Sequence, residues 1–307
     1  MKSISMIEIL KNTNGELKHL NKPVKGCWIN LISPTRSELH QLKSIIDIPN
    51  DIITSVKDKN EISSIEKYKD NLFVLVQVPK AKEDLEYETV PIGIIKTNDC
   101  VITISYYDNE IIEILKTKQI NTVKQGQFGL QLLLTSTEAY MKYLGEINKK
   151  VYNIRKELQK SMKNKNLMKL LDIEKSLVYF NTSLEANKRL VEKMKRDKIF
   201  KKQYINLVDD VMEEYNQAIQ MTKIYSDILT GIMNGFSSVI SNKLNTTMRF
   251  LTSVTIILML PTLVSSIYGM NISLPLESHP SAFIILMLGS ILLAAIGIIF
   301  FWKSDML

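Results

Sequence analysis

The sequence predicts an α+β membrane protein with an N-terminal α/β/α domain, a long stalk helix that continues into a first transmembrane helix, and a second transmembrane helix. Two uncharged apolar runs lie near the C-terminus and predict the membrane spans. Five of the eight prolines fall between Pro23 and Pro91, and the next one is Pro261. Because proline interrupts helices, we expect short elements in the first third of the chain and long helices in the middle.

The apolar runs cover residues 250–268 and 282–302, and neither contains a charged side chain. A helix needs ~20 residues to cross the hydrocarbon core of a bilayer, and each run is about that long. A single apolar run of this length could instead be a buried core helix of a soluble domain. Two runs joined by a short segment that contains Pro275 and Pro280 favour a membrane hairpin.

Basic residues near the spans predict the orientation of this hairpin. Lys243 and Arg249 precede the first span, Lys303 follows the second, and the loop between the spans has no Lys or Arg. Short cytoplasmic segments next to membrane spans are enriched in Lys and Arg. We therefore expect a multi-pass protein of the cell (plasma) membrane with both termini in the cytoplasm.

Apolar periodicity divides the rest of the chain. Dense apolar runs at 27–31, 72–79 and 101–105 predict strands, and Thr35 and Glu38 form a capping-box pattern at the start of a helix. We expect helices on both faces of the resulting sheet. Apolar residues at three- and four-residue spacing then predict two antiparallel helices, followed by a helix of roughly 60 residues that would be about 90 Å long.

These patterns give the expected organisation of the chain. Its parts are a cytosolic α/β domain over 1–128, an antiparallel helical hairpin over 129–203, a stalk helix with the first span over 204–268 (membrane part 250–268), an extracytoplasmic loop over 269–281, the second span over 282–302 and a cytosolic tail over 303–307.

Composition and missing motifs narrow the classes of function. The net charge of +7 is spread over isolated lysines, which favours a solvated surface and not nucleic acid as a partner. Cys27 and Cys100 lie far apart in the sequence and are expected to be buried thiols in a reducing compartment. The chain has no phosphate-binding loop, His-Glu-x-x-His motif or calcium loop. We therefore expect no organic cofactor and no enzyme activity, which leaves passive conduction of ions.

The first span carries a stripe of polar and Met side chains that share one helix face. Its members are Asn245, Met248, Thr252, Thr255, Met259, Thr262 and Ser266. The stripe could pack against the second span, since Ser and Thr favour helix contacts in membranes, or it could line a water-filled axis. Two spans cannot enclose such an axis, so a pore requires a ring of identical subunits.

The first span ends in Tyr268-Gly269-Met270-Asn271, followed by a short loop and the final span. This arrangement resembles the CorA-type magnesium/cobalt channel family, in which a Gly-Met-Asn motif occupies the same place. The segments WINLISPT, EKYKDNLFVLVQVP, EKSLVYFNTSLEANK and SNKLNTTMRFLT also resemble family segments in the same order. The resemblance implies a homopentamer in the lipid bilayer, with a cytosolic funnel, a stalk helix that leads into the pore, and an outer second span.

The resemblance also implies roles for individual residues. Asn271 would receive the hydrated ion at the pore mouth, with Gly269 and Met270 shaping the turn. Neutral amide oxygens can hydrogen-bond the water shell of Mg²⁺ without removing it. Asn271 could also act as a helix C-cap, which Asn favours. Thr262 and Met259 resemble pore-lining positions, Met248 and Leu251 an apolar constriction, and Asn245 a polar ring near the cytosolic entrance.

Two acidic residues are candidates for a regulatory Mg²⁺ site between subunits. Asp210, in LVDDVMEEY, resembles one such family position, and Asp51, in PNDIIT, could supply the other side. Both could instead be solvated acids on helix surfaces. If they bind metal, the cation would relieve the repulsion between carboxylates and hold the ring closed.

The expected function is a homo-oligomeric channel that conducts hydrated Mg²⁺, and also Co²⁺ or Ni²⁺, into the cytosol with feedback closure by intracellular Mg²⁺. One alternative is a related carrier for Zn²⁺ or for efflux, although the sequence places no dedicated His or Cys ligands near the pore. Another is a membrane-tethered cytosolic scaffold, which would leave the polar stripe without a role.

Overall fold

The computed structural model describes residues 6–13, 15–46, 48–82, 86–160, 163–275, 279–304 and 306 of the chain. The chain divides into two compact units, Met1–Gly231 and Ile232–Leu307. Helix α6 (Ile205–Tyr268) contributes to both units, and α7 (Ala282–Lys303) belongs to the second. One helix running from the region of residue 204 to residue 268 was predicted, and α6 confirms it.

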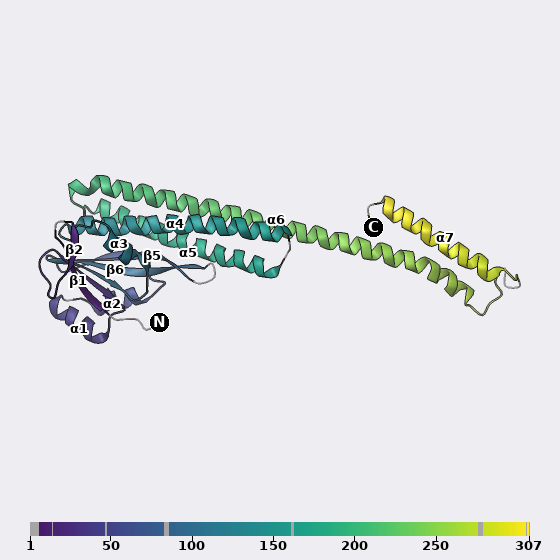
Figure 1. Cartoon of the computed structure of the whole chain (residues 1–307), viewed down its shortest axis with the longest axis horizontal. Helices are drawn as coiled ribbons and strands as arrows, with labels where there is room; N and C mark the ends of the chain where they lie inside the picture. The colour runs from purple at the N-terminus through teal and green to yellow at the C-terminus, as the bar shows by residue number, and fades with distance from the viewer. Residues whose placement is uncertain are drawn as a thin grey trace. The chain divides into compact units, whose positions relative to one another are not determined.

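A seven-stranded mixed sheet forms the centre of the first unit (Figure 1). Its order is β2-β1-β3-β7-β6-β5-β4, in which β3 and β7 pair in parallel and the other neighbours are antiparallel. The predicted strands at 27–31, 72–79 and 101–105 correspond to β3, β5 and β7, which confirms them. The strands are β1 (Met6–Thr13), β2 (Glu16–His19), β3 (Cys27–Ile32), β4 (Ser64–Tyr68), β5 (Asn71–Ala81), β6 (Tyr87–Lys96) and β7 (Cys100–Ser105).

Helices cover both faces of the sheet, as predicted (Figure 1). On one face, α1 (Arg36–Ile45) and α2 (Asn50–Lys57) bury apolar side chains against β3, β5 and β7. The capping box at the start of α1 is present: the Glu38 main-chain N–H donates to Thr35 Oγ1 (3.3 Å), and the Thr35 N–H donates to the Glu38 carboxylate (2.8 Å).

The other face is covered by a pair of long helices, α4 (Gln125–Lys160) and α5 (Asn164–Arg196), with α3 (Glu110–Thr117) preceding them. Helix α4 begins at Gln125, before the predicted start at residue 129. The Phe128 ring in its first turn packs on Trp28 of β3 with ring centroids 5.1 Å apart, and both side chains are fully buried. Burial of Phe128 therefore stabilises the additional turn.

A chain of hydrogen bonds satisfies the buried polar groups around Trp28. The Trp28 indole N–H donates to Thr103 Oγ1 (2.8 Å), whose hydroxyl donates to Asn30 Oδ1 (2.8 Å). The Asn30 amide then donates to Glu8 (2.9 Å), which pairs with Lys116 at 2.7 Å. The buried groups reach solvent through this chain, and each avoids the cost of an unpaired polar atom.

The side-chain amide of Asn187 joins α5 to the sheet, because it makes the hydrogen bonds to β5 that a neighbouring strand would otherwise make. The pairing of β4 with β5 ends at Ser64 opposite Leu75, so the main chain of Gln77 extends beyond it. The fully buried Asn187 of α5 satisfies Gln77: the Gln77 N–H donates to Asn187 Oδ1 (3.1 Å), and Asn187 Nδ2 donates to the Gln77 carbonyl (2.7 Å).

The first part of α6 packs through an apolar stripe that includes the buried Val208, Val211 and Tyr215. Exposed ion pairs between Lys195 and Asp209 and between Glu185 and Lys223 also connect α5 with α6. Surface pairs of this kind contribute little, so apolar burial is the main attachment of α6.

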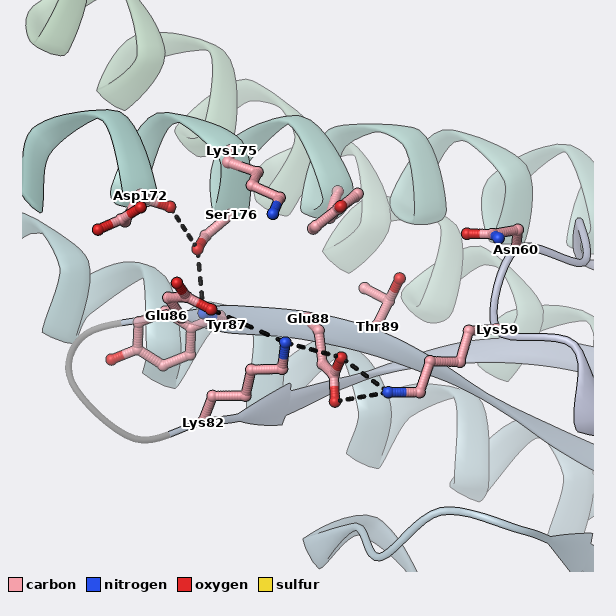
Figure 2. A pocket seen from close by; sticks show the side chains of 11 residues that line it. Lys59, Asn60, Lys82, Glu86, Tyr87, Glu88, Thr89, Asp172, Lys175 and Ser176 are labelled. Carbon is pink, nitrogen blue, oxygen red and sulfur yellow. Dashed lines mark hydrogen bonds and ion pairs between the residues drawn. The ribbon is translucent and has the colours of Figure 1, made fainter. Parts of the chain in front are cut away.

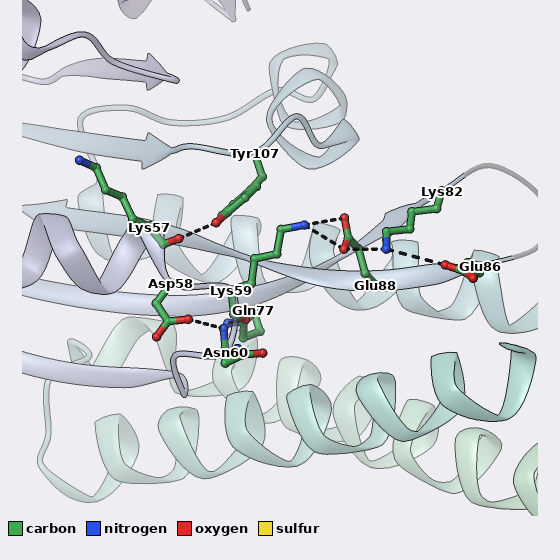
Figure 3. Close-up of polar contacts among 9 residues, drawn as sticks. All are labelled: Lys57, Asp58, Lys59, Asn60, Gln77, Lys82, Glu86, Glu88 and Tyr107. Carbon is green, nitrogen blue, oxygen red and sulfur yellow. Dashed lines mark hydrogen bonds and ion pairs between the residues drawn. The ribbon is translucent and has the colours of Figure 1, made fainter.

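A cluster of charged side chains lies where β6 begins, next to α5, around a small cavity of about 100 Å³ (Figure 2). Glu88, whose side chain is 12% exposed, accepts hydrogen bonds from Lys59 (3.0 Å) and Lys82 (3.2 Å). Gln77 Nε2 donates to the Lys59 carbonyl (3.2 Å), which holds the segment that carries Lys59 (Figure 3). Both lysines thus have a carboxylate partner, and the cluster ties β5, β6 and the segment after α2 together.

These contacts lower the pKa of Glu88. Partial burial acts in the opposite direction and raises the pKa, but the hydrogen bonds and charges of Lys59 and Lys82 together outweigh burial and hold the pKa below its usual value. A carboxyl whose pKa is lower in the folded state adds stability above its unfolded pKa, and this contribution is lost as the pH falls through the folded pKa.

We expect Glu88→Gln to lower the free energy of unfolding by about 1–3 kcal/mol at pH 7, because two lysines lose a charged partner. The difference from wild type should shrink at an acidic pH below the lowered pKa of Glu88, where Glu88 itself becomes protonated. Thermal unfolding of the purified full-length protein at both pH values measures this. Glu86→Gln is the matched control, since Glu86 is more exposed and lies 3.7 Å from Lys82. An equal effect of Glu88→Gln at both pH values would contradict the prediction.

Candidate functional site

The second unit contains two helices long and apolar enough to cross a membrane, the last part of α6 and the whole of α7. The most apolar window of each is almost entirely exposed, 11% buried in the helix that includes α6 and unburied in α7. Exposed apolar surface of this extent is not stable in water and requires a bilayer or a partner. The two predicted spans are therefore present as helices.

One face of α6 packs against α7. Ser253 is fully buried, and its hydroxyl donates to the main-chain oxygens of Arg249 (2.9 Å) and Met306 (3.3 Å). Gly297 of α7 faces this side, because a Cβ atom there would lie 3.4 Å from both Ile257 and Leu260. A small residue at this point lets the two helices approach closely. Nearer the loop, a mostly apolar hollow of about 680 Å³ separates the helices.

The polar stripe lies on the other side of α6. At roughly 100° per residue, Thr255 and Thr262 lie about 140–160° around the helix from Ile257 and Leu260. Every member of the stripe is exposed in the single chain: Asn245, Met248, Thr252, Thr255, Met259, Thr262 and Ser266. The alternative that the stripe packs against the second span therefore disagrees with the structure, in which another face makes that contact.

Two threonine hydroxyls of the stripe donate back to their own helix. Thr255 Oγ1 donates to the Leu251 carbonyl (2.8 Å), and Thr262 Oγ1 donates to the Leu258 carbonyl (2.9 Å). The hydroxyl proton is thereby occupied, and the lone pairs of each oxygen remain available as acceptors. Such oxygens can accept hydrogen bonds from water bound to a cation. Leu251 is 57% exposed and lies at the edge of the stripe.

The main chain turns sharply where α6 ends. The Gly269 N–H donates to the Ser265 carbonyl (3.0 Å), and the Met270 N–H donates to the Ile267 carbonyl (3.2 Å). A Cβ atom on Gly269 would lie 3.3 Å from the Ser265 oxygen, so glycine suits this close approach. The Tyr268 hydroxyl then donates to the Pro275 carbonyl (3.3 Å) and closes the segment that contains the Gly-Met-Asn triplet.

Asn271 lies in this closed segment and is exposed. It is not the C-cap of α6, because the helix ends at Tyr268 and Gly269 and Met270 supply the capping hydrogen bonds. Nor does Asn271 have the positive φ angle of an αL cap. Its amide is therefore free of that structural role. Residues 276–278 of the loop, which include its one acid, Glu277, lie outside the described residues.

The candidate regulatory acids lie apart in a single chain. Asp51 is exposed in the first turn of α2, and Asp210 is exposed on α6, away from its buried stripe. Because α2 and the α4–α6 group cover opposite faces of the sheet (Figure 1), one chain does not bring the two carboxylates together. Among the described residues, no group of three or more His, Cys, Asp or Glu side chains forms a metal site.

Sequence reasoning missed two features of this unit. The pairing of Gly297 with Ile257 and Leu260 was not predicted, although a glycine within an apolar membrane helix is a signal for close helix contact. The closure of the turn by Tyr268 and Pro275 was also missed, because a hydrogen bond from a side chain to a carbonyl seven residues away leaves no pattern in the sequence.

Comparisons with known proteins agree with this architecture. The family model described as CorA-like Mg²⁺ transporter protein matches residues 25–303. The cobalt/magnesium transport protein CorA of Methanocaldococcus jannaschii is 28% identical over 287 residues, which is 90% of each chain, and the magnesium transport protein CorA of Helicobacter pylori is 24% identical over 254 residues, 80% of this chain and 79% of the relative.

Solved structures give the same result. The complete structure of the CorA magnesium transporter from Methanocaldococcus jannaschii matches with a TM-score of 0.86 and 25% identity over 99% of both chains. The full-length CmaX protein shares the fold, with a TM-score of 0.73 and 12% identity over 97% of both chains. The match of the family model to most of the chain, together with these likenesses, shows that the protein belongs to the CorA-like Mg²⁺ transporter family.

Proposed function

We propose that this protein is a homo-oligomeric channel that conducts hydrated Mg²⁺ into the cytosol down its electrochemical gradient. The observation that carries the proposal is the polar stripe of α6, which faces away from α7 and is exposed along its whole length in one chain. A ring of identical subunits, five by resemblance to the family, would turn these stripes toward a common axis. We include Co²⁺ as a second substrate in this proposal, because relatives are named cobalt/magnesium transport proteins.

The mouth of the pore is proposed at Asn271. A ring of neutral amide oxygens accepts hydrogen bonds from the water molecules around Mg²⁺, which releases its own water reluctantly. Binding through the water shell is weak enough for the ion to leave again, whereas a ring of carboxylates would hold it. The turn from Tyr268 to Pro275 positions the amide, and Gly269 and Met270 shape that turn.

The rest of the stripe provides the path. Thr262, Thr255 and Thr252 offer hydroxyl oxygens, and Met259 lies between them. Met248 and Leu251 would form an apolar constriction that stops ions by excluding water when it narrows. Asn245 would form a polar ring at the cytosolic entrance. With Lys243, Arg249 and Lys303 near the spans, we place both termini in the cytoplasm of a plasma-membrane protein.

Closure by intracellular Mg²⁺ is proposed to act through Asp210 and Asp51. Because the two carboxylates lie apart in one chain, they can share a cation only if they come from neighbouring subunits. Both are exposed and available for this. Mg²⁺ at that position would link subunits, and its loss would leave carboxylates that repel each other.

Substitution of Asn271 by Ala should reduce Mg²⁺ flux at least tenfold, on the order of 1.4 kcal/mol or more, because the water shell loses its hydrogen-bond partners at the mouth. Flux is measured in liposomes loaded with a magnesium-sensitive dye at matched reconstitution. Ser273→Ala, in the same exposed turn, is the control and should retain wild-type flux. If the intact protein conducts Zn²⁺ but not Mg²⁺, the alternative of a related metal carrier replaces the proposal.

Removal of one stripe hydroxyl should also slow conduction. We expect Thr255→Val to lower Mg²⁺ flux about fivefold, the equivalent of one hydrogen bond of ~1 kcal/mol, while Thr255→Ser retains it. Thr247→Val is the matched control. Its hydroxyl makes the same bond to its own helix, to the Lys243 carbonyl at 2.9 Å, but it lies off the stripe. Equal losses in Thr247→Val and Thr255→Val would show that helix stability, and not the path, is responsible.

Asp210→Ala should shift the internal Mg²⁺ concentration for half-inhibition upward by about tenfold, because the regulatory cation loses a carboxylate ligand. The measurement is flux into liposomes whose internal Mg²⁺ is clamped at a series of concentrations. Asp209→Ala serves as the control, since Asp209 pairs with Lys195 within the same subunit. Unchanged inhibition in Asp210→Ala would remove this residue from the gating proposal without affecting the pore.

A further inference from the structure

The two cysteines of the chain, which are far apart in the sequence, lie side by side in the sheet. Cys27 is the first residue of β3 and Cys100 the first residue of β7, and the two are direct partners in the parallel pairing of these strands. Both are free thiols and both are buried, with Cys27 fully enclosed and Cys100 5% exposed. The protein has two cysteines in total, so there is no third cysteine with which either of them could pair within the chain.

The two side chains point to the same face of the sheet. Paired residues of adjacent strands project on the same side, and both cysteines belong to the apolar cluster under α1 and α2. The two thiols are near enough for Cys27 to raise the pKa of Cys100. Adjacent strands are about 4.7–4.9 Å apart, and disulfide-bonded cysteines have Cα atoms about 4.4–6.8 Å apart. The backbone spacing of the pair therefore already suits a disulfide.

One of the two thiols is accessible to a small solute. Cys100 lines a surface hollow of about 560 Å³ together with residues that include Lys25, Asn71 and Asp99. Thr97 Oγ1 lies 3.5 Å from Cys100 Sγ at the edge of this hollow. A molecule of the size of hydrogen peroxide can approach Cys100 through this hollow, whereas Cys27 is fully enclosed.

We propose that Cys27 and Cys100 form a redox-modifiable dithiol that a peroxide oxidises to a disulfide between β3 and β7. The Cys100 sulfur attacks one peroxide oxygen, the O–O bond breaks, and the products are a sulfenic acid on Cys100 and one water molecule. The Cys27 sulfur then attacks Cys100 Sγ, the S–O bond breaks, and the released hydroxide takes the Cys27 proton as a second water. Two thiols are oxidised, and one peroxide is reduced to two waters.

The surroundings favour the disulfide over other products. The pair lies in an apolar core, which tolerates a neutral S–S bond. The same core disfavours a charged product, such as a sulfinate or a charged thiolate–metal complex, because burial of an unpaired charge is costly. Burial raises the pKa of Cys100, and the nearby Cys27 adds to this effect, so the thiol is largely protonated at neutral pH. The reaction is therefore slow, and it responds to sustained oxidation and not to brief exposure.

The test uses the full-length protein in detergent, exposed to hydrogen peroxide under native conditions. Remaining thiols are blocked with N-ethylmaleimide after unfolding, and intact mass and peptide mapping are recorded. We expect wild type to lose both thiols, to gain a cross-linked peptide pair containing Cys27 and Cys100, and to unfold at a higher temperature. Reduction with dithiothreitol should reverse all three changes. In Cys27→Ser, the first step should remain and the second should not, so dimedone should trap a sulfenic acid on Cys100.

If the Cys27→Ser variant fails to fold, the measurements on the wild-type protein are sufficient to test the proposal. Retention of both thiols under prolonged peroxide treatment overturns it, as does oxidation of Cys100 to sulfinic acid with Cys27 unchanged. A disulfide that links two chains, detected as a dimer on a non-reducing denaturing gel, also overturns it, because the pairing across β3 and β7 is within one chain.

Discussion

Helix α6 must satisfy its main-chain hydrogen bonds internally wherever it is surrounded by lipid, and this constraint determines how the rest of the second unit is built. A bilayer offers no water to an unpaired N–H or carbonyl, so the helix has to continue without interruption through the apolar run. It continues through Pro261, which has no N–H to donate to the Ile257 carbonyl, and the hydroxyls of Ser253, Thr255 and Thr262 donate to carbonyls of the preceding turn. Within this continuous helix, the two sides differ. One side receives the small residue Gly297 of α7, and the other carries the polar stripe.

The outline of the fold could be predicted because its signals are local. Apolar runs predicted β3, β5, β7 and both membrane helices, and the capping box at Thr35 predicted the start of α1. Strand β6 gave no such signal, since it contains Pro91 and Gly93, residues that usually weaken a strand. Pro91 is accommodated beyond the part of β6 that pairs with β7. Gly93 is required because a Cβ atom there would lie 2.6 Å from Val56 of α2. Both reasons are tertiary and leave no trace in a single sequence.

In the candidate site too, features with a local sequence signal could be predicted and features that depend on tertiary contacts could not. The spacing of the stripe was visible in the sequence, but which face of α6 meets α7 was not, because many apolar residues of the span could serve equally well. The position of Asn271 could be taken from its motif, whereas its freedom from a capping role depends on hydrogen bonds made by Gly269 and Met270. The neighbourhood of Cys27 and Cys100 was beyond prediction for a further reason. Parallel strands are joined by long connections, so their register cannot be read from short-range patterns.

The amide of Asn187 has a mechanical consequence. Because it holds both main-chain groups of Gln77, a shift of α5 by one residue along β5 would break two hydrogen bonds in a buried place. These hydrogen bonds therefore oppose sliding of α5 along the sheet. Among the described residues, the first part of α6 rests on α4 and α5 mainly through apolar side chains and exposed ion pairs, contacts that oppose sliding less than a buried pair of hydrogen bonds does. We therefore expect sliding of α6 across the helical pair to cost less than sliding of α5 across the sheet.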